Sequence, residues 1–377
     1  MLRHYRTVYS TSYRTVYVIA GDMSHERLMM SVPSEVASVD RGQGVEMTAV
    51  THDRYGPPAV LRVSSMAVPS PRRNEVLLRV STAGVSRGVW HMMTGLPRLV
   101  RVASGLRRPR QNVPGMDVCG EVVAVGSEVS SLQLGQRVFG IARGSFAEYA
   151  VAKASHLAPA PVELDDTEAG VLAESGLTAL QALDRGGIDG TVRPGTRVLI
   201  IGASGGVGSL AVQIAALRGA DVTAVCGDSK RNLVESLGAA RTIDYRSEDA
   251  LAQGERYDVI LDGAGGASLN ALRGALVPRG TLIFVGNESG GTWTGGYGRP
   301  FAYQLRMAWG GQRFVNLLVR TNSADLVRLA DLASQGGLRP HVHASYPLSG
   351  VPTALEELAS GAVAGKIAIH VNEQENR

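Results

Sequence analysis

A glycine-rich turn between an apolar strand and a helix places the strongest constraint on how this chain can fold. Residues 198–201 read Val-Leu-Ile-Ile, and Gly202-Ala-Ser-Gly-Gly-Val-Gly208 follows and leads into a helical pattern that ends at Arg218. Gly205 lets the backbone approach a pyrophosphate, and Gly208 lets helix and strand pack closely. The first N–H groups of the helix then face the phosphates at the positive end of its dipole. This context predicts a dinucleotide-binding turn rather than an incidental glycine-rich loop, with contacts from Ala203, Ser204, Gly205, Gly206, Val207 and Gly208.

Strands and helices continue to alternate after this turn. The predicted strands are Arg197–Ile201, Asp221–Val225, Arg241–Ile243, Tyr257–Leu261 and Thr281–Val285, and the predicted helices are Gly206–Arg218, Ser229–Leu237 and Ala267–Leu276. Such a succession is what a doubly wound parallel sheet requires. We therefore expect an α/β fold with a Rossmann dinucleotide-binding domain over residues 171–310.

Residues 47–170 show a different pattern, in which short β-rich pieces are separated by Gly and Pro. Glu75–Ser81 alternates polar and apolar side chains, as a half-buried strand does, and further strands are predicted at Gly120–Gly126, Gln136–Phe139 and Ser145–Val151. Closely spaced strands with glycine turns favour a small β-barrel or sandwich. The chain returns to β-like material at its end, with a helix at Ser323–Gln335 and a strand at Lys366–Val371. We expect one domain from residues 47–170 and 311–377, with the Rossmann domain inserted in it.

Residues 1–46 read differently from the rest. They contain the echo Tyr5-Arg-Thr-Val-Tyr9 and Tyr13-Arg-Thr-Val-Tyr17, and no acidic residue precedes Asp22. A transit peptide has this kind of composition, so that interpretation stays open. The interpretation we favour is a poorly ordered N-terminal extension, with the folded protein beginning at Met47.

Composition narrows the class of protein. The formal charge of +4 over 377 residues does not indicate nucleic acid, and no apolar run is long enough for a membrane span. Two cysteines cannot form a disulfide framework or a four-cysteine structural zinc site, and their low number is typical of a reducing cytoplasm. We expect a cytoplasmic protein without a nucleic-acid partner.

The residues after the second Rossmann strand bear on the choice of cofactor. They read Cys226-Gly-Asp-Ser-Lys-Arg231. Ser229, Lys230 and Arg231 favour the extra phosphate of NADPH, whereas Asp228 is the type of residue that binds the ribose of NADH. A solvated helix start would also explain Lys230 and Arg231. NADPH is the favoured cofactor, and NADH stays open.

At this point the chain from Met47 to Val371 resembles the medium-chain dehydrogenase/reductase superfamily, specifically its zinc-independent, quinone-oxidoreductase-like branch. The resemblance is carried by Tyr55-Gly-Pro57 with Val60-Leu61, Pro114-Gly-Met-Asp-Val-Cys-Gly120, Gly144-Ser-Phe-Ala-Glu-Tyr149, Ser175-Gly-Leu-Thr-Ala179, Ala203–Gly208, Leu237-Gly-Ala239 and Gly365-Lys-Ile367. It implies a GroES-like β-barrel catalytic domain beside the Rossmann domain, a cleft between the two, and a homodimer.

The chain departs from the zinc-dependent members of this superfamily at the metal ligands. The matching positions hold Ser86, Met116-Asp117 and Glu174, and the cysteine-rich structural-zinc loop is missing. Zinc prefers thiolate, imidazole or carboxylate ligands, so we expect no bound metal.

Without a metal, hydrogen-bond donors have to stabilise the charge that develops on the substrate oxygen, and the candidate catalytic residues are Ser86 and His91. An ordinary, partly exposed histidine is the alternative for His91. By resemblance, Arg87 contacts the pyrophosphate, Thr178 lies at the domain junction and Tyr245 lies near the adenosine phosphate. Gly286 and Asn287 follow the fifth strand near the nicotinamide.

Two further segments stand out. Arg98–Arg110 contains five arginines and could attract an acidic substrate or membrane headgroups, although a solvated loop is the commoner explanation for such a run. Gly290–Gly298 is glycine-rich and could form a lid over the cleft.

These observations predict an enzyme, a zinc-independent NAD(P)H-dependent oxidoreductase that transfers a hydride to a quinone or an α,β-unsaturated carbonyl. Two alternatives remain. One is a metal-free alcohol or aldehyde dehydrogenase, and the other is a redox sensor that binds NADPH without turnover.

Overall fold

The computed structural model describes residues 45–286, 303 and 311–371. The contacts divide the chain into Met1–Val45 and Glu46–Arg377, and the description below concerns the second unit. The proposed extension, Asn287 and the glycine-rich segment 290–298 lie outside the described residues, apart from Val45 and Glu46.

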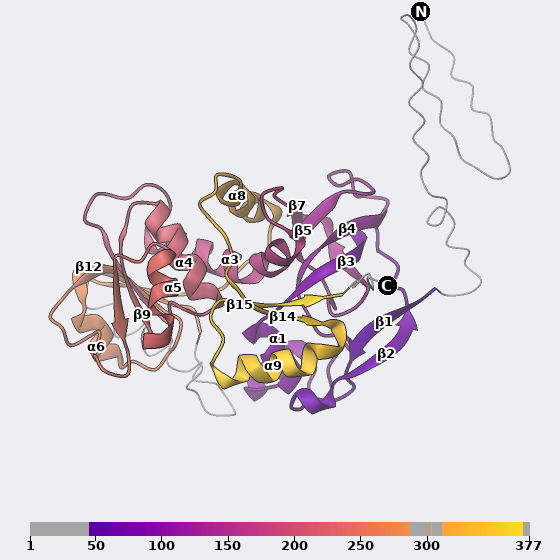
Figure 1. The fold of residues 1–377 in the computed structure, drawn as a ribbon, viewed down its shortest axis with the longest axis horizontal. Helices are drawn as coiled ribbons and strands as arrows, with labels where there is room; N and C mark the ends of the chain where they lie inside the picture. The colour runs from indigo at the N-terminus through magenta and orange to yellow at the C-terminus, as the bar shows by residue number, and fades with distance from the viewer. Residues whose placement is uncertain (1–44, 287–302, 304–310, 372–377) are drawn as a thin grey trace, which may run out of the picture. The chain divides into compact units, whose positions relative to one another are not determined.

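A six-stranded parallel sheet forms the first part of the fold (Figure 1). Its strands are β8 (Arg197–Ile201), β9 (Asp221–Cys226), β10 (Arg241–Asp244), β11 (Tyr257–Asp262), β12 (Leu276–Phe284) and β13 (Arg313–Asn316). They lie in the order β10-β9-β8-β11-β12-β13, which is 3-2-1-4-5-6 when counted along the chain. This is the order of the Rossmann fold, so the predicted doubly wound sheet is confirmed.

Both faces of this sheet are buried, which explains why β8 is a continuous apolar run. Val198 and Ile200 join one hydrophobic cluster together with Leu210 of helix α4, while Leu199 joins a second cluster with Ile260. Side chains alternate between the two faces of a strand, so a strand covered on both sides needs apolar residues throughout. The helices of this half are α4 (Gly206–Leu217), α5 (Arg231–Ser236) and α6 (Leu269–Gly274).

A seven-stranded, mostly antiparallel sheet forms the second part of the fold. Its strands are β3 (Glu75–Val85), β4 (Asp117–Val125), β5 (Arg137–Ile141), β6 (Tyr149–Lys153), β7 (Leu157–Pro159), β14 (Val342–Pro347) and β15 (Lys366–His370), and β1 (Glu46–Thr51) pairs with β2 (Arg62–Ala67) beside it. The helices of this part are α1 (Arg87–Thr94), α2 (Arg101–Ser104) and α9 (Val351–Ser360). Because β15 pairs with β3, the end of the chain completes the sheet that its first half begins.

The parallel sheet takes its last strand from beyond residue 310. β13 pairs with β12 in parallel, although its residues fall in the 311–377 range that the sequence assigned to the barrel. We propose that the boundary between the two domains lies after Asn316.

Helix α3 (Asp166–Gly186), which the sequence patterns did not single out, contacts strands of both sheets (Figure 1). The Asp165 side chain caps its first turn and the Glu168 side chain returns a hydrogen bond, forming a capping box. Fifteen of its 21 residues are buried, because the helix is covered on several sides. A helix buried nearly all round shows little 3.6-residue amphipathic contrast, which is why the sequence pattern is weak there.

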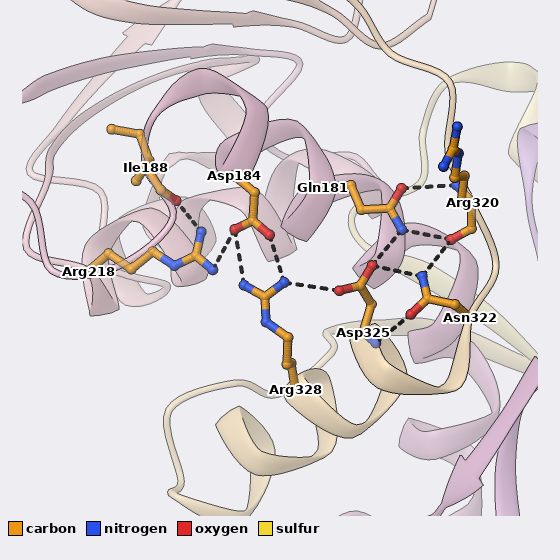
Figure 2. Close-up of polar contacts among 8 residues, drawn as sticks. All are labelled: Gln181, Asp184, Ile188, Arg218, Arg320, Asn322, Asp325 and Arg328. Carbon is orange, nitrogen blue, oxygen red and sulfur yellow. Dashed lines mark hydrogen bonds and ion pairs between the residues drawn. The ribbon is translucent and has the colours of Figure 1, made fainter.

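A polar network ties helix α8 (Ser323–Ser334) to the end of α3 (Figure 2). Asp184 accepts from two guanidinium groups, Arg218 at 3.0 Å and Arg328 at 2.7 Å. Gln181 donates to the Arg320 carbonyl at 2.7 Å and accepts from the Arg320 N–H at 2.9 Å. The segment that returns from the parallel sheet to the barrel is thus held against α3 by charged and amide contacts.

Candidate functional site

The glycine turn lies at the carboxyl end of β8, where the strand order of the parallel sheet reverses. β9 lies on one side of β8 and β11 on the other, and α4 begins directly after the turn. The crevice at such a reversal point is where doubly wound sheets bind their ligands.

At two glycine positions of the turn, a residue with a side chain would be strained or would clash. Gly202 has φ of +82°, in the left-handed region that favours glycine. A Cβ at Gly208 would lie 2.2 Å from the carbonyl oxygen of Gly202, so the close approach of helix and turn requires its absence. The buried residue Ala203 fixes the turn to the next strand, since its N–H donates to the Val225 carbonyl at 3.0 Å.

The N-terminus of α4 suits a pyrophosphate. Gly205 occupies the N-cap position, and no side chain caps the first N–H groups of the helix. Gly205, Gly206 and Val207 are only half-buried, so this end of the helix is open on one side. Uncapped N–H groups at a helix start are a ready anion-binding site, and the residues present therefore fit a dinucleotide.

The barrel contacts this turn from its other side. Gly365 donates its N–H to the Ser204 carbonyl at 2.8 Å, and Gly205 and Gly365 form an isolated β-bridge. A Cβ at Gly206 would lie 2.9 Å from Cδ of Lys366. The Gly-Lys pair near the end of the chain thus packs directly on the predicted cofactor turn.

A buried ion pair stands next to this contact. Lys366 Nζ lies 2.9 Å from Asp117 Oδ2 and donates to Ser175 Oγ at 3.2 Å. Asp117 is the first residue of β4, which begins three residues before the predicted strand, and its second oxygen accepts from the Glu174 N–H at 2.6 Å. The pair and its hydrogen bonds join β15, β4 and α3, and Gly365, the neighbour of Lys366, contacts the turn.

The carboxyl group of Glu174 is buried beside this ion pair. Its Oε2 has no hydrogen-bond partner, and a Cβ on Gly88 would lie 2.4 Å from Oε1. Burial first, and then the negative charge of Asp117, raise the pKa of Glu174 to about 7, against smaller opposing effects of Lys366 and the Ser86 hydroxyl. A carboxyl group in this environment holds a proton near neutral pH.

The two predicted catalytic residues both lie at helix α1. Ser86 is buried and caps the helix, since its Oγ accepts from the Val89 N–H at 3.3 Å. His91 lies on the same helix, half-buried, with Nδ1 at 2.7 Å from the Leu96 carbonyl. Arg87 is the first residue of α1 and is also half-buried. Ser86 comes close to Glu174, whereas His91 contacts the Leu96 carbonyl of the loop that follows its own helix.

Thr178 and Gly286, which the resemblance also assigns to the site, take different positions. Thr178 is buried on α3, and its hydroxyl donates to the Glu174 carbonyl at 2.7 Å. Gly286 follows β12 and is half-buried, and among the described residues a Cβ there would meet the Gly263 carbonyl oxygen alone within 4 Å, at 3.9 Å. Gly286 therefore lies at the carboxyl edge of the parallel sheet.

The end of β9 holds the residues that bear on NADPH. A 3-10 turn (Asp228–Lys230) precedes α5, where the sequence predicted one helix from Ser229. Ser229 is exposed, but Lys230 donates to the carbonyls of Gly361 at 3.1 Å and Val363 at 2.9 Å. Burial, and next the charge of Arg246, lower the pKa of Lys230. The ammonium group of Lys230 is thus partly committed to backbone contacts.

A further basic side chain, Arg246, lies at the end of β9, and it was not named from the sequence. Its guanidinium stacks on the exposed ring of Tyr245 at 4.7 Å from the centroid. A Cβ on Gly227 would lie 2.6 Å from Arg246 Nη1, so the guanidinium closes over the end of β9. The position of Arg246 directly after Tyr245, at the end of the predicted strand Arg241–Ile243, is the signal that could have found it.

Among the described residues, no helix combines the length and the apolar character that a membrane crossing needs.

Two family models match the chain. Residues 72–162 match the alcohol dehydrogenase GroES-like domain, and residues 237–369 match a family described as zinc-binding dehydrogenase. A chloroplast envelope quinone oxidoreductase homolog of Arabidopsis thaliana is 31% identical over 338 residues, which cover 86% of this chain and 99% of that protein. A mitochondrial protein of Drosophila melanogaster, NAD(P)H oxidoreductase RTN4IP1, is 30% identical and covers 99% of this chain and 96% of its own length. The structure of the quinone oxidoreductase from Coxiella burnetii is similar with a TM-score of 0.75 and 28% identity, covering 87% of this chain and all of that one.

The description of the second family names zinc, but the residues at the matching positions do not fit it. Both carboxylate oxygens of Asp117 are engaged, one by Lys366 and the other by the Glu174 N–H. Ser86 Oγ caps α1, and the thioether of Met116 is a ligand for softer ions. Glu174 alone would remain as a donor that zinc prefers, and one carboxylate cannot form a tetrahedral site.

Proposed function

This chain belongs to the medium-chain dehydrogenase/reductase superfamily, in its quinone-oxidoreductase-like branch, and is an oxidoreductase; from this we propose that it transfers a hydride from NADPH to a quinone or an α,β-unsaturated carbonyl without zinc. The observation that carries the proposal is the uncapped N-terminus of α4, placed by Gly202–Gly208 at the reversal point of the parallel sheet. When bound, the nicotinamide supplies the hydride. The protein binds the cofactor, orients it towards the substrate and donates a proton to the substrate oxygen.

The preference for NADPH is supported by the basic end of β9. Arg246 is exposed and stacked on Tyr245, so its remaining N–H groups can pair with a phosphate, and a guanidinium matches the geometry of phosphate oxygens. Ser229 and Lys230, which the sequence predicted to contact the same phosphate, also follow the carboxyl end of β9. Asp228 lies in a surface ion pair with Arg231, 3.2 Å between Oδ1 and Nε, but it is 78% exposed, so the preference for NADPH rests on Arg246.

Proton delivery is proposed for Ser86, with His91 as the second candidate. Ser86 caps α1 beside the buried carboxyl group of Glu174, which keeps a proton near neutral pH. A protonated carboxyl can replace the proton that the serine hydroxyl gives to the substrate oxygen, so no metal is needed for charge neutralisation. His91 donates from Nδ1 to the Leu96 carbonyl, so it would deliver a proton through Nε2 only from the form that carries a proton on both ring nitrogens.

The experiment that tests the proposal follows NADPH oxidation at 340 nm by the purified full chain. A panel of quinones and enones serves as acceptors, and alcohols with NADP⁺ serve for the reverse chemistry. Reduced cofactor deuterated at the nicotinamide C4 distinguishes direct transfer, because an enone product then carries the label at the β-carbon. Tight NADPH binding without turnover on any acceptor would favour the sensor, and turnover confined to alcohols would favour the metal-free dehydrogenase.

A homodimer and a location in the cytoplasm are also part of the proposal. The dimer is expected from the resemblance and the location from the low cysteine content. Light scattering coupled to size exclusion tests the first, and fractionation of the source cells tests the second.

A further inference from the structure

The segment 96–110, which follows the candidate catalytic helix α1, exposes an unusual number of aliphatic side chains. Leu96 is 38% exposed, Leu99 50%, Val102 62% and Leu106 70%. No other fifteen-residue stretch among the described residues has more than two large exposed hydrophobic side chains. We call this segment the Leu-Arg turn. Neighbouring exposed apolar side chains mark an interaction surface, unlike single ones scattered over the protein.

The backbone of the Leu-Arg turn is fixed, so the exposure is not that of a loosely placed loop. The Tyr55 hydroxyl donates to the Gly105 carbonyl at 2.5 Å, and Arg101 Nε donates to the Gly95 carbonyl at 3.0 Å. The Arg101 guanidinium also lies over the Tyr55 ring, 4.6 Å from its centroid. Residues Arg98–Val100 and Arg101–Ser104 form consecutive helical turns that end at Gly105. The protein therefore holds these aliphatic side chains outward on a defined platform.

Along the sequence of this segment, every charged side chain is an arginine. Arg107, Arg108 and Arg110 are exposed, and Arg98 is exposed as well. No aspartate or glutamate occurs in the sequence between Glu75 and Asp117. Arginines interleaved with exposed aliphatic residues combine the two forces that hold a protein at an anionic membrane surface.

We propose that the Leu-Arg turn binds the surface of an anionic phospholipid bilayer. The aliphatic side chains of Leu99, Val102 and Leu106 enter the boundary between headgroups and acyl chains. Arg107, Arg108 and Arg110 pair with headgroup phosphates. A dissolved anion would leave the aliphatic side chains in water. A protein partner could also accept these exposed arginines, since arginine is enriched in protein interfaces, and failure of the wild type to sediment with anionic vesicles is the outcome that would favour it. This inference does not depend on the proposed reaction.

Vesicle co-sedimentation of the full chain tests the proposal. The probes are vesicles of phosphatidylcholine alone and vesicles in which part of it is replaced by phosphatidylglycerol. The charge variant is Arg107→Gln/Arg108→Gln, with Arg193→Gln/Arg279→Gln as its control at exposed arginines elsewhere. The apolar variant is Val102→Ser/Leu106→Ser, with Leu134→Ser/Val162→Ser as its control at residues that are 64% and 88% exposed. Equal urea midpoints establish that the variants are folded.

The wild-type chain and both controls are expected to sediment with the anionic vesicles and to stay in solution with phosphatidylcholine. The charge variant is expected to bind about thirtyfold more weakly, since each arginine near an anionic surface contributes about 1 kcal/mol. The apolar variant is expected to lose about tenfold or more, at high salt as well as low. Equal partition of the wild type to both vesicle types overturns the proposal. Undiminished binding by the apolar variant also overturns the proposal, because it would show that the segment binds anions without its aliphatic side chains. Displacement of the protein from the vesicles by millimolar inorganic phosphate would overturn the proposal for the same reason.

Discussion

Lys366 Nζ lies 2.9 Å from Asp117 Oδ2, and the two side chains are 3% and 0% exposed. The pair joins the first residue of β15 to the first residue of β4. Gly365, the neighbour of Lys366, donates to the Ser204 carbonyl in the glycine turn. One buried charge pair therefore sets how the end of the barrel sheet meets the turn at which the cofactor is proposed to bind.

Replacing Lys366 by Met is expected to lower the free energy of unfolding by about 3–5 kcal/mol, because it leaves a buried carboxylate without its partner. The double variant Lys366→Met/Asp117→Asn should recover part of this loss. Urea denaturation measures both. The matched control is Arg62→Met in the pair Arg62–Asp53, whose side chains are 61% and 64% exposed. It should change stability by less than about 1 kcal/mol. A loss in Lys366→Met no larger than in the control would contradict the assigned role of the pair.

The buried carboxyl group of Glu174 is expected to make stability depend on pH. Because folding raises its pKa from 4.5 to about 7, the native state binds the proton more tightly, and stability falls as pH rises between these two values. In Glu174→Gln this contribution disappears, so the variant should gain stability relative to the wild type from pH 5 to pH 8. The gain should reach about 1 kcal/mol or more, since one pKa unit corresponds to about 1.4 kcal/mol. Urea midpoints at pH 5, 6, 7 and 8 give the difference, and a constant difference over this range would sink the prediction.

Arg246→Ala is expected to weaken NADPH binding by about tenfold to a hundredfold, since a hydrogen bond to a charged group contributes about 1.5–3 kcal/mol. NADH lacks the phosphate, so its dissociation constant should stay within about twofold. Fluorescence titration with each cofactor supplies both values. Lys230→Ala is the matched comparison, with a smaller expected effect because its ammonium donates to two carbonyls. Equal losses for NADPH and NADH in Arg246→Ala would show that Arg246 does not recognise the phosphate.

Gly208→Ala is expected to destabilise the protein by more than about 1 kcal/mol and to weaken both cofactors. The new Cβ would stand 2.2 Å from the Gly202 carbonyl, and backbone would have to move. Gly190→Ala is the control, because a Cβ there meets nothing within 4 Å. The unfolding free energies of the two variants and their affinities for NADPH are compared. Tolerance of the Gly208 substitution in both measurements would refute the close approach.

Local patterns allowed much of the fold to be predicted. The elements around the turn follow from signals within a few residues: β8 begins and ends as predicted, and α4 ends one residue before Arg218. Helix α3 was missed because burial on several sides removes the amphipathic contrast. β13 was placed with the barrel because a four-residue strand carries no sign of which sheet it joins.

Some residues of the candidate site could likewise be predicted from the sequence, and others could not. Ser86 and His91 could be named from the sequence, but the proximity of Ser86 to Glu174 depends on the packing of α1 against α3. The contacts of Lys230 with Gly361 and Val363 join residues more than 130 positions apart, and no local pattern contains them.

The sequence by itself determined the glycine turn and the alternation around it, because both depend on steric and periodic rules that act over a few residues, while its motifs carried the resemblance to the family. Only the tertiary structure decided the pairing of Lys366 with Asp117, the burial of Glu174 and the place of Arg246 over Gly227. These features arise where distant segments exclude water together, and the energy of a charge depends on that shared environment rather than on its neighbours along the chain.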